Sequence, residues 1–169
     1  MKISEIIKSV EASKEYNEFK KDNKDAFLLS LFFIVSPKFE IEIEQVNYFL
    51  PKNNKVMSFI LNNYGIQTKL DELYNKQSHL EKTNNELDTR IKVDLEEMKS
   101  VIDEKASNKK NGDLTKTILV FQELNGKPCW NLTFMFSGLK LLNVIIDAKT
   151  GKIDKEEVTN LADMMKFQK

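Results

Sequence analysis

The chain has almost none of the residues from which common catalytic and metal centres are built. Its 169 residues include one cysteine, Cys129, one histidine, His79, and one arginine, Arg90. A single cysteine allows no intramolecular disulfide and no cysteine-based metal cage. A single histidine would have to carry any zinc site or catalytic dyad alone. We therefore expect a protein that is not an enzyme and holds no metal or cofactor.

Glycine and arginine are too scarce for the usual ways of binding phosphate. The chain has five glycines and no glycine-rich phosphate loop, so close approach of the backbone to a nucleotide is hard to arrange. Lysine plus arginine and aspartate plus glutamate both number 26, which gives zero net charge. Nucleic-acid binders are typically basic and read phosphate or guanine with arginine. The composition predicts no nucleic-acid partner.

Long apolar runs are also absent. The longest, residues 26–35, is ten residues long, whereas a membrane-spanning helix needs about 20 apolar residues. The first residues lead into an amphipathic acidic and basic stretch rather than the apolar core of a signal peptide. We therefore expect a cytoplasmic protein with no membrane partner, in which Cys129 stays reduced.

Four segments carry helical patterns, and one of them allows two interpretations. They are residues 2–23, 69–91, 94–106 and 154–166. In the second, Leu73, Leu80 and Leu87 are seven residues apart, as in a coiled coil, but polar residues interrupt the seam. This stripe either pairs two copies of the chain or packs on its own domain. Asp94 and Glu97 have the spacing of a capping box at the start of the third helix.

Strand patterns occupy the rest of the chain. Residues 26–35 are continuously apolar, which is typical of a strand buried on both faces. Residues 39–50 and 130–136 alternate apolar and polar side chains, as half-buried strands do. Further strands are expected at 56–61, around Ile118 and at 139–147. Asn125 and Gly126 predict a tight hairpin turn.

The two halves of the chain share one order of elements. Residues 2–62 and 94–153 each read as one helix followed by three strands. We therefore predict an α+β fold of two helix-β-β-β units with antiparallel sheets, joined by a long polar helical segment and followed by a C-terminal helix. The expected domains are 1–66, a helical connector at 67–93, and 94–169. The two sheets either join edge to edge or stay separate.

The second half resembles the PepSY-type module. The similarity rests on the helix 94–106, the turn 125–127, the strand 130–133 and the ending 144–153, Val-Ile-Ile-Asp-Ala-Lys-Thr-Gly-Lys-Ile. The first half resembles the same module more loosely and lacks the closing Asp-x-x-Thr-Gly. The whole chain also resembles small archaeal proteins with this double arrangement. The resemblance implies a non-catalytic domain that binds or inhibits peptidases, or that senses and regulates.

Four residues are candidates for a partner-binding site: Trp130, Phe134, Tyr48 and Asp147. The three aromatic residues either pack in the core or, if some stay exposed, form one binding surface. Asp147 closes a strand and either caps the following turn or acts as a ligand or an acid.

Three other features carry weaker indications of chemistry. His79 has no partner at helical spacing for a metal site and is expected to be an exposed helix residue. Cys129 is expected to be a small buried residue rather than a nucleophile. The row of Glu40, Glu42 and Glu44 is either a solvated face or a cation site.

Three functional hypotheses follow. The first is a non-catalytic binding or regulatory protein with a protein or peptide partner, which would bind on a sheet face or along a strand edge. The second is a structural or assembly protein that forms a homodimer through residues 69–91. The third, an enzyme, would depend on Cys129 and His79 or on carboxylates alone.

Overall fold

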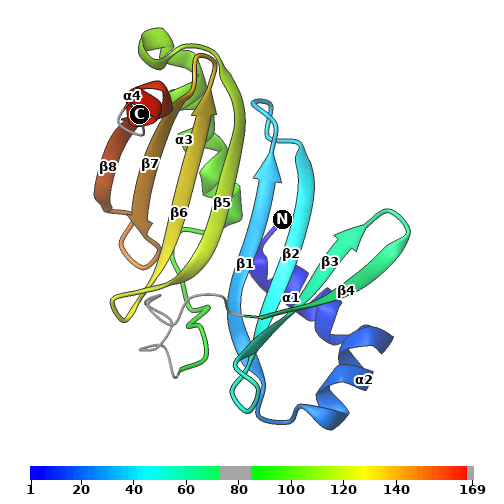
Figure 1. The fold of residues 1–169 in the computed structure, drawn as a ribbon. Coiled ribbons are helices and arrows are strands. Elements are labelled where there is room, and N and C mark those ends of the chain that lie inside the picture. The colour runs from blue at the N-terminus through cyan, green and yellow to red at the C-terminus, as the bar shows by residue number, and fades with distance from the viewer. Residues whose placement is uncertain (73–84, 167–169) are drawn as a thin grey trace.

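All strands of the described residues belong to one antiparallel sheet (Figure 1). The computed structural model describes residues 1–72 and 85–166. The strands are β1 (Phe27–Val35), β2 (Ile41–Leu50), β3 (Lys55–Asn62), β4 (Gly65–Glu72), β5 (Leu114–Leu124), β6 (Lys127–Phe136), β7 (Lys140–Asp147) and β8 (Ile153–Asn160). The helices are α1 (Ile3–Glu11), α2 (Lys14–Asp22), α3 (Leu95–Ser107) and α4 (Leu161–Lys166).

The centre of the sheet is the pairing of β1 with β5. The strand order is β4-β3-β2-β1-β5-β6-β7-β8, so the first strand of each half lies beside the other. Register partners include Leu31 with Phe121 and Phe33 with Leu119. Both strands are rich in β-branched and aromatic residues, which fit a pleated and buried surface. The two halves therefore share one continuous sheet.

Helices α1, α2 and α3 pack on one face of this sheet (Figure 1). Ile3, Ile6 and Val10 form the buried stripe of α1 at helical spacing. A second stripe on α3 consists of Leu95, Met98 and Ile102. Both stripes pack against fully buried strand residues such as Phe33 and Trp130. The hydrophobic core thus lies between the helices and one face of the sheet.

The predicted fold of two helix-β-β-β units joined by a long helix is wrong. Each half has four strands, and the two sets form one sheet. Residues 154–166 were expected to be helical, but Ile153–Asn160 is a strand and only Leu161–Lys166 is a helix. β8 pairs with β7 along its length, and this hydrogen bonding outweighs the helical preference of its charged sequence.

The helical connector predicted at 67–93 is also wrong where the structure describes it. Residues 65–72 form strand β4, which pairs with β3. Residues 85–94, called the strap below, have neither helix nor strand structure. Leu87 is buried, and its backbone N–H donates to the carbonyl of Leu28 at 3.0 Å. The predicted seam positions Leu73 and Leu80 lie outside the described residues.

The first and third helices differ in how closely they follow the sequence pattern. The single helix predicted at 2–23 is two, because Ser13 caps a new helix by accepting a hydrogen bond from the backbone N–H of Tyr16 at 3.1 Å. The capping box of Asp94 and Glu97 at the start of α3 is confirmed.

No helix within residues 1–72 and 85–166 has the length and apolar character needed to cross a membrane.

Candidate functional site: the uncovered face of the sheet

Side chains of a strand point alternately to the two faces of its sheet, and among the described residues α1, α2 and α3 all pack on the same face (Figure 1). On β1, Phe33 and Val35 are buried beneath the helices, whereas Phe32 and Ile34 are half-buried on the opposite face. Residues 26–35 were expected to be buried on both faces. The structure covers only one of them, and we call the other the open face.

A compact apolar group occupies the middle of the open face. Phe32 lies opposite Val120, and Ile34 lies opposite Ile118, in the register of β1 and β5. All four side chains are half-buried. None of them belongs to the core cluster or to the residues packed against it. We call these four residues the central patch.

Neutral polar side chains flank the central patch on both sides. On the β2 side, the amide Nδ2 of Asn47 donates to Oγ of Ser30 at 3.0 Å, and the hydroxyl of Ser58 donates to Oδ1 of Asn47 at 2.7 Å. On the β6 side, Nδ2 of Asn143 donates to Oδ1 of Asn131 at 2.6 Å. These groups satisfy one another, so they keep the face uncharged.

Two pairs of charged side chains lie on the outer strands of the open face. On β4, Lys69 pairs with Asp71 at 3.1 Å. Lys155 of β8 pairs with Glu157 at 2.9 Å. These two strands are the outermost of the sheet. The open face therefore has an apolar centre beside neutral polar side chains, with paired charges on its outer strands and at the start of β5.

The predicted aromatic site residues lie on the other face. Trp130 and Phe134 are fully buried, and Tyr48 is 2% exposed. The Tyr48 hydroxyl donates to Oε1 of Glu11 at 3.1 Å, and burial raises the pKa of this phenol. These rings pack under the helices and form no surface patch. Sequence reasoning missed the central patch because residues 26–35 are apolar on both faces. Their pattern therefore does not indicate which face the helices cover.

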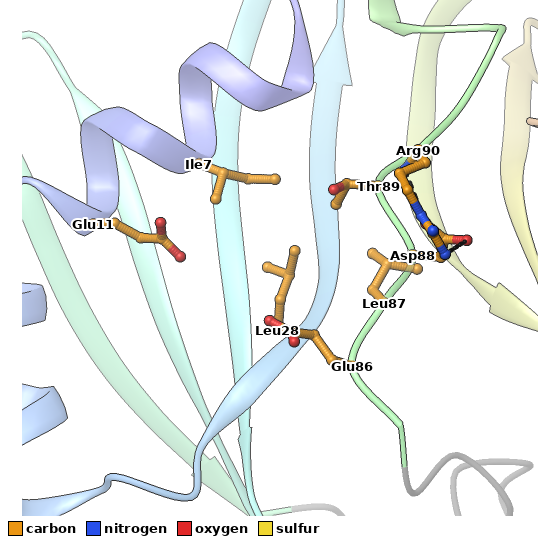
Figure 2. Close-up of a pocket in the computed structure, with 8 residues that line it drawn as sticks. All are labelled: Ile7, Glu11, Leu28, Glu86, Leu87, Asp88, Thr89 and Arg90. Atoms are coloured by element: carbon orange, nitrogen blue, oxygen red, sulfur yellow. Dashed lines mark hydrogen bonds and ion pairs between the residues drawn. The ribbon is translucent and has the colours of Figure 1, made fainter.

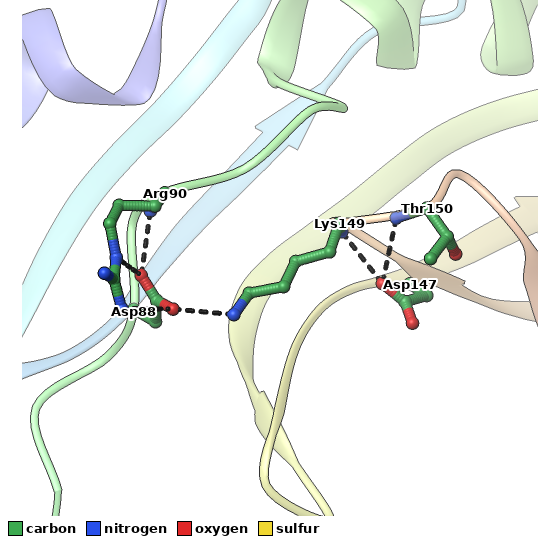
Figure 3. A network of polar contacts seen from close by, with 5 residues as sticks. All are labelled: Asp88, Arg90, Asp147, Lys149 and Thr150. Carbon is green, nitrogen blue, oxygen red and sulfur yellow. Dashed lines mark hydrogen bonds and ion pairs between the residues drawn. The ribbon is translucent and has the colours of Figure 1, made fainter.

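Asp147 forms the turn between β7 and β8 (Figure 3). Its Oδ1 accepts hydrogen bonds from the backbone N–H groups of Lys149 at 2.8 Å and Thr150 at 3.1 Å. The Lys149 ammonium in turn pairs with Oδ2 of Asp88 at 2.8 Å. This geometry matches a turn-capping aspartate. The ion pair between Lys149 and Asp88 connects this turn to the strap.

The strap carries a bidentate ion pair next to this contact (Figure 3). Arg90 donates from Nε to Oδ1 of Asp88 at 2.9 Å and from Nη2 to Oδ2 at 3.2 Å. Hydrogen bonds from Arg90 and Lys149 hold the pKa of Asp88 well below its usual range. Asp88 thus stays ionised, and its charge is balanced by two cations.

The surroundings of Cys129 do not activate its thiol. Burial, with a smaller effect of Asp147, raises the pKa of Cys129 to about 11, so the thiol is neutral near pH 7. A neutral thiol is a poor nucleophile. His79 lies outside the described residues. Within the described residues, no group of three His, Cys, Asp or Glu side chains could hold a metal ion.

Glu42 and Glu44 do not form the uniform solvated row expected from their spacing. Glu42 pairs with Lys116 at 2.6 Å. Glu44 is half-buried, and this burial raises its pKa.

A cavity of about 480 Å³ lies on the helix-covered side of the sheet (Figure 2). Helix α1, the start of β1 and the strap form its walls. Its lining residues are Ile7, Glu11, Leu28, Glu86, Leu87, Asp88, Thr89 and Arg90. This cavity is separate from the open face because Leu28 and Leu87 belong to the core between the helices and the sheet.

Comparison with known proteins supports the fold alone. No protein-family model matches the chain. No curated protein matches it in sequence. Among solved structures, the chain is similar to a protein of Clostridium difficile 630 described as a "putative lipoprotein", with a TM-score of 0.54 and 15% sequence identity. The similarity covers 86% of this chain and 90% of that one.

Proposed function

We propose that this protein is a non-catalytic binding protein that docks another protein on the open face of its sheet. One observation carries the proposal. The two central strands present Phe32, Ile34, Ile118 and Val120 side by side on the face opposite α1, α2 and α3. Contiguous apolar patches that stay partly exposed mark interaction sites more often than isolated apolar residues do.

The size of the open face suits a stable protein interface. Strands lie about 4.8 Å apart and rise about 3.3 Å per residue, so eight strands of about eight residues span roughly 34 by 26 Å. The resulting area is about 900 Å², close to the roughly 800 Å² that each partner buries in a standard interface. The open face is therefore large enough to bind a partner without help from other surfaces.

The chemistry of the open face selects the kind of partner. Its centre is hydrocarbon, and the polar groups beside it are uncharged amides and hydroxyls, of which Asn47 and Ser58 are themselves buried. Two pairs of opposite charges on its outer strands are formed within the chain. A nucleic acid or an anionic membrane would need an excess of cations here. We infer a protein partner with an apolar, uncharged patch of its own.

Site-specific photo-cross-linking in the source cells tests this proposal. A benzophenone amino acid replaces Phe32 in one variant and Lys14, on the exposed side of α2, in a control variant. We expect a cross-linked protein from position 32 that position 14 does not give. That protein is then purified and titrated against the unmodified chain and against the Ile118→Lys variant.

The proposal predicts that Ile118→Lys weakens the reconstituted complex by about 100-fold or more, because it places a charge in an apolar contact. Val120→Ser, which keeps the surface neutral, should weaken it less. Circular dichroism confirms that both variants fold. An unchanged affinity in Ile118→Lys, no specific cross-link from position 32, or a cross-link only to a second copy of this chain would each overturn the proposal.

A further inference from the structure

The cavity between α1 and the strap combines an apolar floor with acidic walls (Figure 2). Ile7, Leu28 and Leu87 supply the floor, and Leu28 and Leu87 are nearly inaccessible to solvent. The hydrogen bond from the N–H of Leu87 to the carbonyl of Leu28 fixes the strap against β1. The floor is therefore set by the core packing.

Three carboxylates line the cavity, but one of them is already balanced. Asp88 is held by Arg90 and by Lys149. Glu11 and Glu86 make no ion pair with a cation of residues 1–72 or 85–166. The only side-chain hydrogen bond to Glu11 among these residues comes from the Tyr48 hydroxyl, which is neutral. Among the described residues, Glu11 and Glu86 are thus the two carboxylates of the lining without a cationic partner.

Glu11 and Glu86 approach the cavity from opposite walls. Figure 2 shows the Glu11 carboxylate on α1 at one side of the cavity and the Glu86 side chain extending from the strap at the other side. The phenol of Tyr16 reports on both, because burial, the charge of Glu11 and, to a smaller extent, the charge of Glu86 raise its pKa. Both negative charges are therefore close enough to act on the Tyr16 hydroxyl.

We propose that this cavity binds an alkylammonium group, with its carbon chain on the floor and its ammonium between Glu11 and Glu86. An ammonium offers three hydrogen-bond donors, so it can bind carboxylates that lie on different walls of the cavity. The aliphatic stem of a lysine can lie on an apolar surface while its charge stays at the wet rim. A lysine side chain of a peptide and a free aliphatic amine share this chemistry. The site lies across the sheet from the proposed protein-binding face and is independent of it.

The test titrates four probes into the protein and measures their binding by calorimetry and by methyl NMR spectra. The probes are n-pentylamine, 1,5-diaminopentane, N-acetyl-lysine methylamide and 1-pentanol. We expect the amines to bind with a Kd of about 1 mM and to shift the methyl signals of Ile7, Leu28 and Leu87. The uncharged alcohol should bind at least about tenfold more weakly, since it lacks the charge. Binding of the lysine derivative alone indicates a peptide ligand, and binding of the free amines alone indicates a small-molecule ligand; both support the site.

Glutamine variants separate charge from shape. Glu11→Gln keeps an oxygen that can accept the Tyr48 hydrogen bond, so this variant should fold normally. Glu11→Gln and Glu86→Gln should each weaken amine binding by about fivefold or more, whereas Glu18→Gln on the exposed side of α2 should leave it unchanged. No saturable binding up to about 20 mM, equal binding of pentanol and pentylamine, or unchanged affinity in both cavity variants would overturn the proposal.

Discussion

The indole Nε1 of Trp130 donates a hydrogen bond to the backbone carbonyl of Val93 at 2.9 Å. The backbone N–H of Val93 also donates to the carbonyl of Ala148 at 2.9 Å. With the bond between Leu87 and Leu28 near its other end, the strap is fastened to both halves of the sheet. A segment without regular structure is thus a fixed part of the helix-covered layer.

Gly151 in the turn after β7 should tolerate a methyl group less well than Gly126 in the β5–β6 turn. Both have positive φ, +81° and +78°, so alanine at either position costs about 1 kcal/mol. A Cβ at Gly151 would lie 3.2 Å from Cγ2 of Val93, whereas at Gly126 nothing is within 4 Å. We expect Gly151→Ala to cost about 1 kcal/mol more in urea unfolding, since the strap must shift. Equal losses would contradict this account of the strap.

Leu87→Asp should unfold or strongly destabilise the protein. Leu87 is 4% exposed, and a carboxylate there would be buried without a partner. We expect a loss of more than about 3 kcal/mol in the free energy of unfolding. Thr89→Asp, two residues along on the exposed side of the strap, should cost less than about 0.5 kcal/mol. A stable Leu87→Asp variant with altered oligomeric mass would instead restore the coiled-coil interpretation.

The Cys129 thiol should resist modification in the native protein. It is 2% exposed, and burial raises its pKa to about 11. We expect a disulfide reagent at pH 8 to react at least about 100-fold more slowly than in guanidinium chloride, because thiolate and access are both limiting. Because the folded pKa lies above the unfolded value of about 8.5, the thiol's contribution to stability is complete below that pH and is lost as pH rises toward 11. Fast labelling of the native state would show that the strand end is open to solvent.

The two halves should not fold separately. In isolation, residues 1–72 would expose the apolar edge of β1, and residues 85–169 would expose that of β5. Unpaired edges of this kind promote aggregation. We expect each fragment to be insoluble when expressed alone and both to be recovered as a soluble complex when co-expressed. Soluble, folded fragments with native spectra would contradict this view and would favour two independent domains.

Much of the local structure was predictable because it depends on near neighbours. Asp94 and Glu97 form the expected capping box, and Asn125 with Gly126 makes the expected tight turn with positive φ at both positions. The candidate site was harder to predict from the sequence. Trp130 stands out in the sequence, but tertiary packing buries it, while the central patch consists of ordinary aliphatic and aromatic residues.

The sequence by itself determined the tight turn at Asn125 and Gly126, the helix cap at Asp94, most strand positions and the scarcity of groups for metal or thiol chemistry, because these follow from local preferences and residue types. Only the tertiary structure decided that β1 pairs with β5, that the charged segment Ile153–Asn160 is an edge strand, and which face of the sheet the helices cover. These features depend on hydrogen bonds and contacts between residues far apart in the chain. The sequence of residues 26–35 is apolar on both faces, so it does not indicate which strand it pairs with or which face the helices cover.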